Sequence, residues 1–210
     1  MIDIKCVTVG PVITNCFLLT DEATKEMAVV DPGDKSDALI NEINASKGKL
    51  KYVILTHGHY DHIGYAKQLA DMFHAKIICG KNTNKFLCDN FLNHSAYHPD
   101  IPDIQPFNGD ILLSDGDTFS LGETKFKYKY TPGHTIDSGC YIFDDNIIAG
   151  DTLFRDSYGR TDLPTGDDTQ MIESIRRLKN LEGDYNVFPG HGYMTTLERE
   201  RKHNPLMSRV

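Results

Sequence analysis

The first half of the chain alternates between short apolar runs, which are typical of β-strands, and apolar residues at helical spacing. The strand signals lie at residues 4–9, 16–19, 27–30, 52–55 and 77–79. After the third of these, Leu39 and Ile43 indicate a helix that Ser36 can cap and that ends near Gly48. This order predicts β-α-β connections.

A second helical pattern follows the fourth strand signal. Residues recur at helical spacing from His62 to Phe73, so we expect one continuous helix there. Residues 91–108 contain Pro99, Pro102 and Pro106. They indicate an irregular connection that is long enough to border a pocket.

The second half begins with the pattern of a strand that has one buried and one solvent-facing side. Residues 118–121 contain a short apolar run, and in residues 125–130 three aromatic side chains alternate with three lysines. Apolar residues at 171–178 then indicate a helix, and Thr195 or Thr196 can cap a last short one. Since both halves hold strands and helices, the pattern predicts a mixed α/β fold.

Length and charge limit what the protein can be. A chain of 210 residues can bury roughly 70% of its unfolded surface, and no linker-like segment divides it. We therefore expect a single domain over residues 1–210. The formal net charge is −8 at pH 7 and the sequence pI is about 5.5. Because such a chain is poorly suited to a phosphate-rich polymer, we expect no nucleic-acid partner.

The amino terminus and the cysteines indicate the compartment. Residues 1–5 lack the basic and apolar regions of a signal peptide, and no apolar run is long enough for a membrane span. The cysteines are odd in number and lie mostly within apolar runs: Cys6, Cys16, Cys79, Cys88 and Cys140. We therefore expect buried free thiols with no catalytic role in a cytoplasmic protein, and no membrane partner.

The motif of residues 57–62, His-Gly-His-Tyr-Asp-His, holds four metal-binding side chains directly after the fourth strand signal. Imidazole and carboxylate are the usual ligands of zinc and other first-row metals. Because an extended backbone points residues i and i+2 the same way, His57 and His59 can converge on one ion. Asp61 and His62 fall where a helix should begin, so they can face a different point.

Three further segments share one arrangement, in which a strand-like run is followed by a glycine and then by a possible ligand. These pairs are Gly133-His134, Gly150-Asp151 and Gly190-His191. Glycine permits the tight turns and close backbone approach of a crowded metal site. Ligands beyond strand ends also suit an α/β protein. One tetrahedral ion would not need so many ligands, so the surplus indicates two ions side by side.

Together these motifs resemble the metallo-β-lactamase superfamily of hydrolases, whose pattern is H-x-H-x-D-H followed by a distant His, a bridging Asp and a final His. Residues 150–155 and 159–164, with the ending at residues 189–192 and 204–206, look like the hydroxyacylglutathione hydrolase (glyoxalase II) branch, especially its short bacterial forms. The resemblance implies a four-layered αββα sandwich, with two sheets packed face to face and helices outside.

The resemblance also implies how the ligands divide between two ions. The sets are His57, His59 and His134 for the first ion, Asp61, His62 and His191 for the second, and Asp151 as a bridge. Two divalent ions facing two carboxylates stay net positive, so they would lower the pKa of a bound water to about 7 and stabilise an oxyanion. We expect zinc, with iron or manganese as alternatives, and Asp61 and Asp151 as catalytic residues.

This chemistry suits ester or thioester hydrolysis best. The leading prediction is cleavage of a small-molecule thioester, such as an S-(2-hydroxyacyl)glutathione, by metal-bound hydroxide. Asp151 in place of cysteine argues against a true β-lactamase. Because 19 residues follow His191 (210 − 191), we expect no separate carboxy-terminal helical domain of the kind that helps full-length glyoxalase II enzymes to hold glutathione. Another thiol ester, or a broader ester range, therefore stays open.

Two other functions fit the same residues. A persulfide dioxygenase is a relative that uses one iron held by the equivalents of His57, His134 and Asp151. It shares the Gly-Arg-Thr-Asp signature found at residues 159–162. The third function is a non-enzymatic binding module in which the ions are structural. The sequence leaves the oligomeric state open.

Several side chains near the motifs have two interpretations each. Arg160 and Asp162 either form a structural ion pair or help to bind an anionic substrate tail. Tyr60 and Tyr193 flank ligands, and they either line the pocket or serve in packing. The remaining histidines are predicted to be surface or locally bonded residues with no role in the site: His74, His94, His98 and His203.

Overall fold

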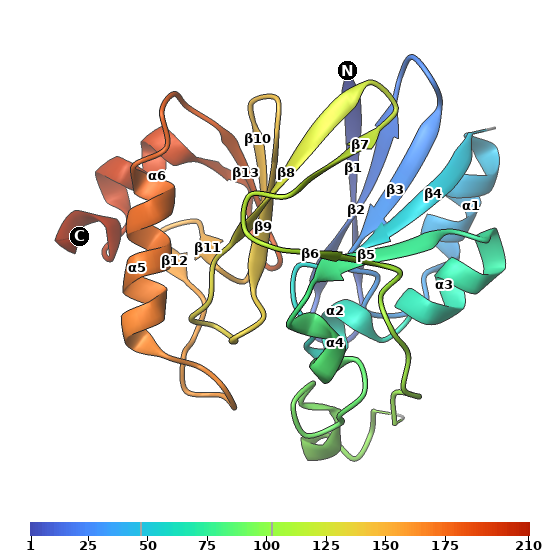
Figure 1. Ribbon diagram of the computed structural model, residues 1–210, viewed down its shortest axis with the longest axis horizontal. Helices are drawn as coiled ribbons and strands as arrows, with labels where there is room; N and C mark the ends of the chain where they lie inside the picture. Colours follow the sequence, from blue (N-terminus) through green and yellow to red (C-terminus); the bar gives the residue numbers. More distant parts are fainter. Residues whose placement is uncertain (47, 102) are drawn as a thin grey trace.

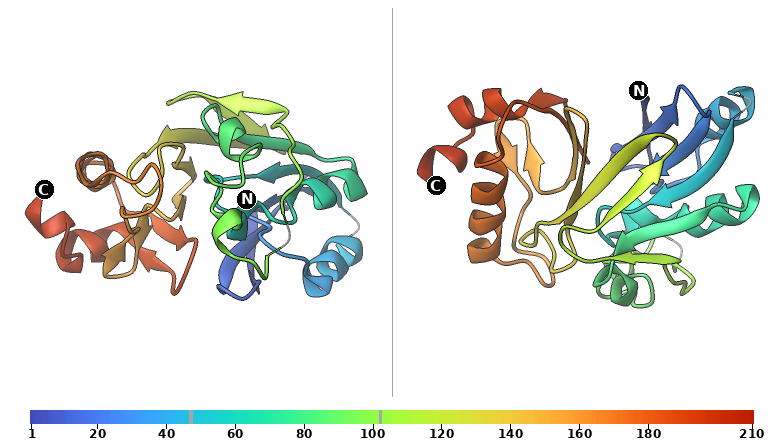
Figure 2. Two further views of the ribbon diagram at one scale, coloured as in Figure 1. Left: turned by 90° about the horizontal axis from the view of Figure 1, so that it is seen from below. Right: turned by 45° about the horizontal axis from the view of Figure 1, so that its top comes forward.

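Two β-sheets lie face to face in the computed structural model, and helices cover the outer side of each (Figure 1). The structure describes residues 1–46, 48–101 and 103–210, and within these ranges each large sheet has six strands. The two further views in Figure 2 show the same arrangement of layers. The predicted αββα sandwich is therefore confirmed.

The first sheet follows chain order. Its strands are β1 (Ile2–Val9), β2 (Thr14–Asp21), β3 (Glu26–Val30), β4 (Lys49–Ile54), β5 (Lys76–Gly80) and β6 (Ile111–Leu113). β1, β2 and β3 pair antiparallel, whereas β3 to β6 pair parallel. The parallel strands therefore end at one common edge, and the motif of residues 57–62 begins at that edge.

The second sheet has the order β14-β13-β10-β9-β8-β7. Its strands are β7 (Thr118–Leu121), β8 (Thr124–Tyr130), β9 (Gly139–Phe143), β10 (Asn146–Gly150), β13 (Asn186–Pro189) and β14 (Thr195–Thr196). β10 and β13 pair parallel and the other neighbours pair antiparallel. A small hairpin of β11 (Leu153–Phe154) and β12 (Ser157–Tyr158) follows β10.

Apolar side chains from both sheets fill the space between them. Ile54 from β4 and Ile78 from β5 belong to the same buried cluster as Phe126, Tyr141 and Phe143 of the second sheet. The rings of Phe126 and Phe143 stack with their centroids 4.2 Å apart. The predicted alternation along β8 is confirmed, because its aromatic side chains point into this cluster and its first two lysines are exposed.

Helices cover the two outer faces. α1 (Asp37–Ala45) and α3 (Ala66–Phe73) bury apolar side chains against the first sheet, and α5 (Asp168–Lys179), α6 (Leu197–His203) and η2 (Met207–Arg209) do so against the second. The Ser36 side chain accepts a hydrogen bond from the Leu39 N–H, as predicted. Of the two candidate caps for the last helix, Thr196 is the one used.

The prediction of one continuous helix from His62 to Phe73 is wrong. The chain forms α2 (Tyr60–Ile63) and then α3, because the Tyr65 N–H donates to the carbonyl of Pro32 (2.9 Å). Gly64 allows this contact, since a Cβ at that position would lie 2.3 Å from the carbonyl oxygen of Gly33. The break lets α2 direct its side chains independently of α3.

The segment at residues 91–108 is irregular, as predicted. It follows α4 (Thr83–Phe86), and its regular part among the described residues is η1 (Ser95–Tyr97). Pro102 lies outside the described residues. In Figure 1 this segment lies at the lower end of the molecule, below α4.

The cysteines are free thiols in the described chain, but two are not buried. Cys16, Cys79 and Cys140 are buried, whereas Cys6 and Cys88 are exposed. Cys6 lies on the edge strand β1, beyond the part of that face which packs into the core between the sheets, and Cys88 lies in the connection after α4. For Cys6, the apolar run therefore predicted the strand but not which of its side chains are buried.

Among the described helices, none combines the length and the hydropathy that a bilayer crossing would need.

Candidate metal centre

The predicted ligands come from five segments that meet at one edge of the two sheets. The loop after β4 carries His57 and His59, and α2 carries Asp61 and His62. The other three follow the ends of β8, β10 and β13: His134, Asp151 and His191. All seven side chains lie in one cluster, so the sequence-based grouping holds in space.

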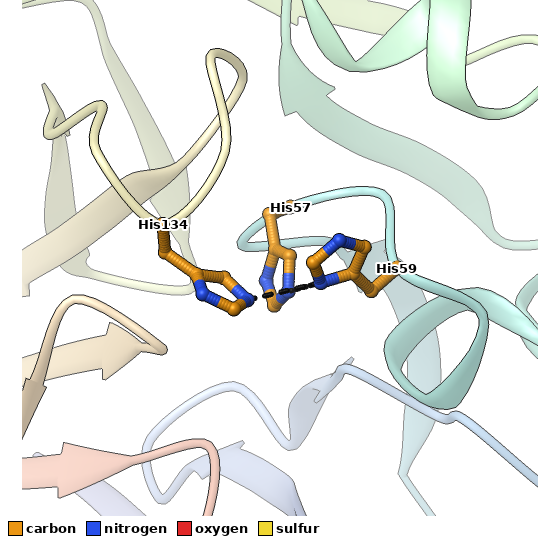
Figure 3. Close-up of side chains that lie close together, drawn as sticks. All are labelled: His57, His59 and His134. Atoms are coloured by element: carbon orange, nitrogen blue, oxygen red, sulfur yellow. Dashed lines mark hydrogen bonds between the residues drawn. The ribbon is translucent and has the colours of Figure 1, made fainter. Parts of the chain in front are cut away.

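The first group consists of three histidines. His59 Nδ1 lies 3.1 Å from His57 Nε2 and 2.9 Å from His134 Nε2. Figure 3 shows the three rings pointing at one another, with His57 and His59 from one loop and His134 from another. His134 Nδ1 donates to the carbonyl of Arg160 (2.7 Å), so its Nε2 lone pair faces the group. Three ring nitrogens this close are suited to one shared cation.

The second group consists of Asp61, His62 and His191. Asp61 Oδ2 lies 3.5 Å from His62 Nε2 and 3.2 Å from His191 Nε2. The hydroxyl of Thr14 donates to the same carboxylate oxygen (2.9 Å) and fixes its orientation.

Asp151 touches both groups. Its Oδ1 lies 3.5 Å from His62 Nε2, and its Oδ2 lies 3.5 Å from both His134 Nε2 and His191 Nε2. A carboxylate in this position can bridge two cations. The backbone approaches closely here, since a Cβ on Gly190 would lie 2.2 Å from Asp151 Oδ1. Glycine before His191 is therefore required by space.

The side chains fit a metal ion. His62 Nε2 and Asp151 Oδ1 are buried and have no hydrogen-bond partner among the described residues, although each is a strong polar atom. Imidazole nitrogens and carboxylate oxygens are the donors that zinc, iron and manganese accept. A cation between these atoms would satisfy both of them.

The electrostatics of the site agree with this fit. Burial and the neighbouring histidines lower the pKa of His57 and His59 well below the usual value, so these rings are neutral and free to ligate. Burial disfavours charge on His62, but Asp61, Asp151 and Asp31 outweigh it and raise its pKa to about 10. The carboxylates therefore attract positive charge to this point, and a metal cation supplies such a charge.

Asp31 contacts the site although no sequence pattern described above marks it. Its Oδ2 accepts hydrogen bonds from His62 Nδ1 (2.9 Å) and from the Thr56 hydroxyl (2.6 Å). Because the Thr56 hydroxyl donates its proton to Asp31, its oxygen accepts the hydrogen bond from His57 Nδ1 (3.1 Å). One carboxylate thus orients a histidine of each group.

Two hydrogen bonds tie the ligand loops of the two sheets together. The Gly139 N–H donates to the carbonyl of Thr56 (2.9 Å), and the Tyr141 hydroxyl donates to the carbonyl of Leu55 (2.8 Å). The acceptors directly precede His57, and the donors follow His134 in the chain. These bonds therefore hold the two histidine loops at a fixed spacing.

Comparison with known proteins agrees with this geometry. Residues 9–191 match the profile of the metallo-beta-lactamase superfamily. The chain belongs to that superfamily. A hydroxyacylglutathione hydrolase of Haemophilus influenzae, GloC, is 35% identical over 210 residues, which is 98% of each chain. The predicted resemblance is therefore confirmed.

Two solved structures share the fold over nearly the whole chain. The crystal structure of the BLEG-1 B3 metallo-beta-lactamase has a TM-score of 0.91 and 32% identity, and covers 98% of this chain and 100% of that one. The structure of TTHA1623 in a di-iron-bound form has a TM-score of 0.82 and 29% identity, with coverages of 96% and 98%.

A pocket of 610 Å³ opens over the centre. Five of the seven predicted ligands line it: His59, Asp61, His134, Asp151 and His191. Apolar side chains, among them Val12, Phe154 and Leu163, form other parts of the wall. The pocket thus brings a small molecule into contact with both groups of ligands.

Arg160 and Tyr60 line this pocket, but Tyr193 does not. Arg160 forms a bidentate ion pair with Asp162, with both N–O distances at 2.6 Å, so it is both ion-paired and accessible to a ligand. Tyr193 is 78% exposed, which makes the packing alternative wrong for it. It lies beside His191 in a shallow neighbouring hollow.

The prediction that His94 and His98 have no part in the site needs correction. Both line the pocket, because the carbonyl of Asn93 accepts a hydrogen bond from the Tyr60 N–H at the start of α2 (2.8 Å). No metal-ligand spacing marks them in the sequence, and the prediction that residues 91–108 border a pocket was the available signal. His74 and His203 lie outside the pocket lining, as expected.

Proposed function

We propose that this superfamily member is a hydrolase with two divalent metal ions, and that it cleaves a small thioester such as an S-(2-hydroxyacyl)glutathione. The observation that carries the proposal is the contact of Asp151 with histidines of both groups at the floor of the 610 Å³ pocket. The hydroxyacylglutathione hydrolase relative supports the substrate class.

Each set of residues has a distinct task in this proposal. His57, His59 and His134 would hold one ion, the group around Asp61 would hold the other, and Asp151 would bridge them. Bound divalent ions would supply an activated water and an electrophile for the substrate carbonyl. Zinc is the first candidate, with iron or manganese as alternatives.

The pocket walls position the substrate. Arg160 offers a guanidinium to an anionic group of the substrate, while Asp162 holds that guanidinium in place. The apolar side chains around the rim restrict water near the reacting carbonyl. The thiol product would leave through the open side of the pocket.

A mononuclear iron dioxygenase acting on a persulfide is the second candidate. The observation in its favour is that His57 shares one candidate group with His134 and another with Asp151, and that His134 Nε2 lies 3.5 Å from Asp151 Oδ2. A histidine pair with one carboxylate suits non-haem iron. The same fold also serves the B3 metallo-beta-lactamase named above, so β-lactam cleavage belongs among the tested reactions.

The test combines metal content with three reactions. The protein is prepared with zinc, manganese or iron, and metal per chain is measured by mass spectrometry. Each form is then assayed for hydrolysis of S-lactoylglutathione, oxygen uptake with glutathione persulfide and opening of a chromogenic β-lactam. His203→Ala, which changes an exposed histidine away from the pocket, serves as the matched control for Asp151→Asn.

The outcomes separate the candidates. Two metals per chain with thioester turnover that Asp151→Asn abolishes and His203→Ala leaves intact support the proposal. One iron with oxygen consumption supports the dioxygenase instead. A protein that binds metal and is inactive in all three assays would be a binding module with structural ions.

A further inference from the structure

His94 and His98 form a polar pair in the pocket wall. His94 Nδ1 lies 3.2 Å from His98 Nε2, so the two rings are joined by one hydrogen bond. The His94 ring faces His59, with centroids 6.0 Å apart, and the His98 ring faces Tyr60 at 4.9 Å. The pair therefore lies beside the first group of ligands.

The backbone holds this pair firmly against α2. The Tyr60 N–H donates to the carbonyl of Asn93 (2.8 Å), and the buried Asn93 amide donates to the carbonyl of Phe86 (3.2 Å). His94 has a φ of 70°, in the left-handed region that costs a non-glycine residue roughly 1 kcal/mol. The segment thus keeps a histidine where glycine would be conformationally easier.

The shared hydrogen bond determines what the pair can offer to a ligand. In a neutral imidazole one ring nitrogen is a donor and the other an acceptor. If His94 donates to His98, then His94 Nε2 is left as an acceptor and His98 Nδ1 as a donor. In the opposite tautomers these roles are exchanged. In both cases the pair presents one donor and one acceptor, and neither free nitrogen bonds another described residue.

The hydrogen bond between the two rings requires at least one of them to be neutral, because two protonated imidazoles offer no acceptor to each other. Arg160 lines the same pocket, so the charge of an anionic substrate already has a partner there. A neutral donor and acceptor pair is suited to an uncharged polar group.

We propose that His94 and His98 bind an uncharged substrate group that both donates and accepts a hydrogen bond. This inference rests on the proposed thioester hydrolysis, and the group has two sources in S-lactoylglutathione. One is the 2-hydroxyl of the acyl half, and the other is a peptide amide of the thiol half. In either case the pair determines which thioesters bind well, and it takes no part in cleavage of the thioester bond.

Three substrates distinguish the two sources. S-Lactoylglutathione has both groups, S-acetylglutathione lacks the hydroxyl, and the S-ethyl thioester of lactate lacks the amides. Loss of one hydrogen bond to substrate should lower kcat/KM about tenfold. If the hydroxyl is bound, His94→Leu shows this loss with both lactate thioesters. If an amide is bound, the loss appears with both glutathione thioesters.

Conservative variants separate recognition from shape. His94→Gln and His98→Asn keep a donor and an acceptor and should retain most of kcat/KM, whereas His94→Leu fills similar space without them. Metal content must stay at the wild-type value in each variant. His203→Ala is again the control, because this histidine is exposed and lies outside the pocket.

Equilibrium binding keeps the inference testable if hydrolysis is absent. S-Methylglutathione and free lactate are titrated into metal-loaded wild type and into His94→Leu by calorimetry. Failure of the wild type to hydrolyse any thioester would overturn the proposed function, whereas weaker binding to His94→Leu would still support the pair as a binding site. The inference would be overturned if His94→Leu lowered kcat/KM equally for all three thioesters. It would also be overturned if His94→Leu and wild type had the same kcat/KM and the same binding affinity.

Discussion

Asp31 Oδ2 lies 2.9 Å from His62 Nδ1 and, through the Thr56 hydroxyl, is also joined to His57. Asp31 therefore orients one histidine of each ligand group through the ring Nδ1, directly for His62 and through Thr56 for His57. Asp31→Asn should weaken the affinity for both ions by roughly 10–100-fold, as expected for a residue that orients metal ligands. Competition with a chromophoric chelator measures the two affinities.

Thr56→Val gives the matched comparison. It removes the link to His57 but leaves the bond between Asp31 and His62, so only the first ion should bind more weakly. Asp34→Asn, an exposed carboxylate three residues further along, should have no effect. Equal weakening of both ions by Thr56→Val would contradict this account.

Asp61→Ala should remove the second ion and spare the first. The Asp61 carboxylate contacts His191 and His62, and none of the three histidines of the first group depends on it for a hydrogen bond. We expect about one metal per chain and a loss of thioester hydrolysis of more than roughly 100-fold, because a direct ligand matters more than a residue behind it. Survival of both activity and the second metal would show that the dinuclear assignment is wrong.

Asp137 should make the free energy of unfolding depend on pH. Burial raises the pKa of this carboxyl to about 6 from 3.8, although Thr135, Thr83 and the Gly58 N–H lie close enough to offset part of the effect. Neither of its oxygens has a hydrogen bond of ordinary geometry with the described residues. Between about pH 4 and pH 6, the folded protein therefore keeps the Asp137 proton while the unfolded chain releases it.

The free energy of unfolding should consequently fall as the pH rises from about 4 to about 6, by at most about 3 kcal/mol from this group. Asp137→Asn cannot ionise, so its stability relative to wild type should increase over the same window. Urea denaturation of the two metal-free proteins at several pH values measures the difference. A constant difference across the window would refute the role assigned to Asp137.

Arg160→Ala tests substrate recognition. The carbonyl of residue 160 keeps its bond to His134 in this variant, so metal binding should be unchanged. If the guanidinium binds substrate, kcat/KM should fall about tenfold or more for anionic thioesters and little for neutral ones. Asp162→Ala removes the ion-pair partner and should give a smaller loss. Equal losses for both substrate classes would indicate a scaffolding role.

The ligands could be predicted from the sequence because their signal is local. Four of them lie within residues 57–62, and the other three follow a strand-like run and a glycine. Once the strands form, their ends place these residues at one edge without further information. The sandwich itself required the resemblance, since periodicity alone indicates only mixed α/β.

The positions of other residues in the site depend on contacts between segments that are distant in the sequence, which local patterns do not reveal. Asp31 meets Thr56 because β3 and β4 pair in parallel, with Val30 opposite Ile54. His94 lies at the pocket because the carbonyl of its neighbour Asn93, in the irregular segment, accepts a hydrogen bond from the Tyr60 N–H. The split between α2 and α3 likewise follows from the contact of Tyr65 with Pro32, which is remote in sequence.

The hydrogen bonds from Gly139 to Thr56 and from Tyr141 to Leu55 join two segments that each carry only part of the predicted ligand set. The amino-terminal half contributes four ligands and the carboxy-terminal half three, and neither half by itself contains the bridging arrangement. Loading with metal would therefore report whether the halves have docked in register. A substitution between the sheets, far from any predicted ligand, should then lower the metal content before it unfolds the protein.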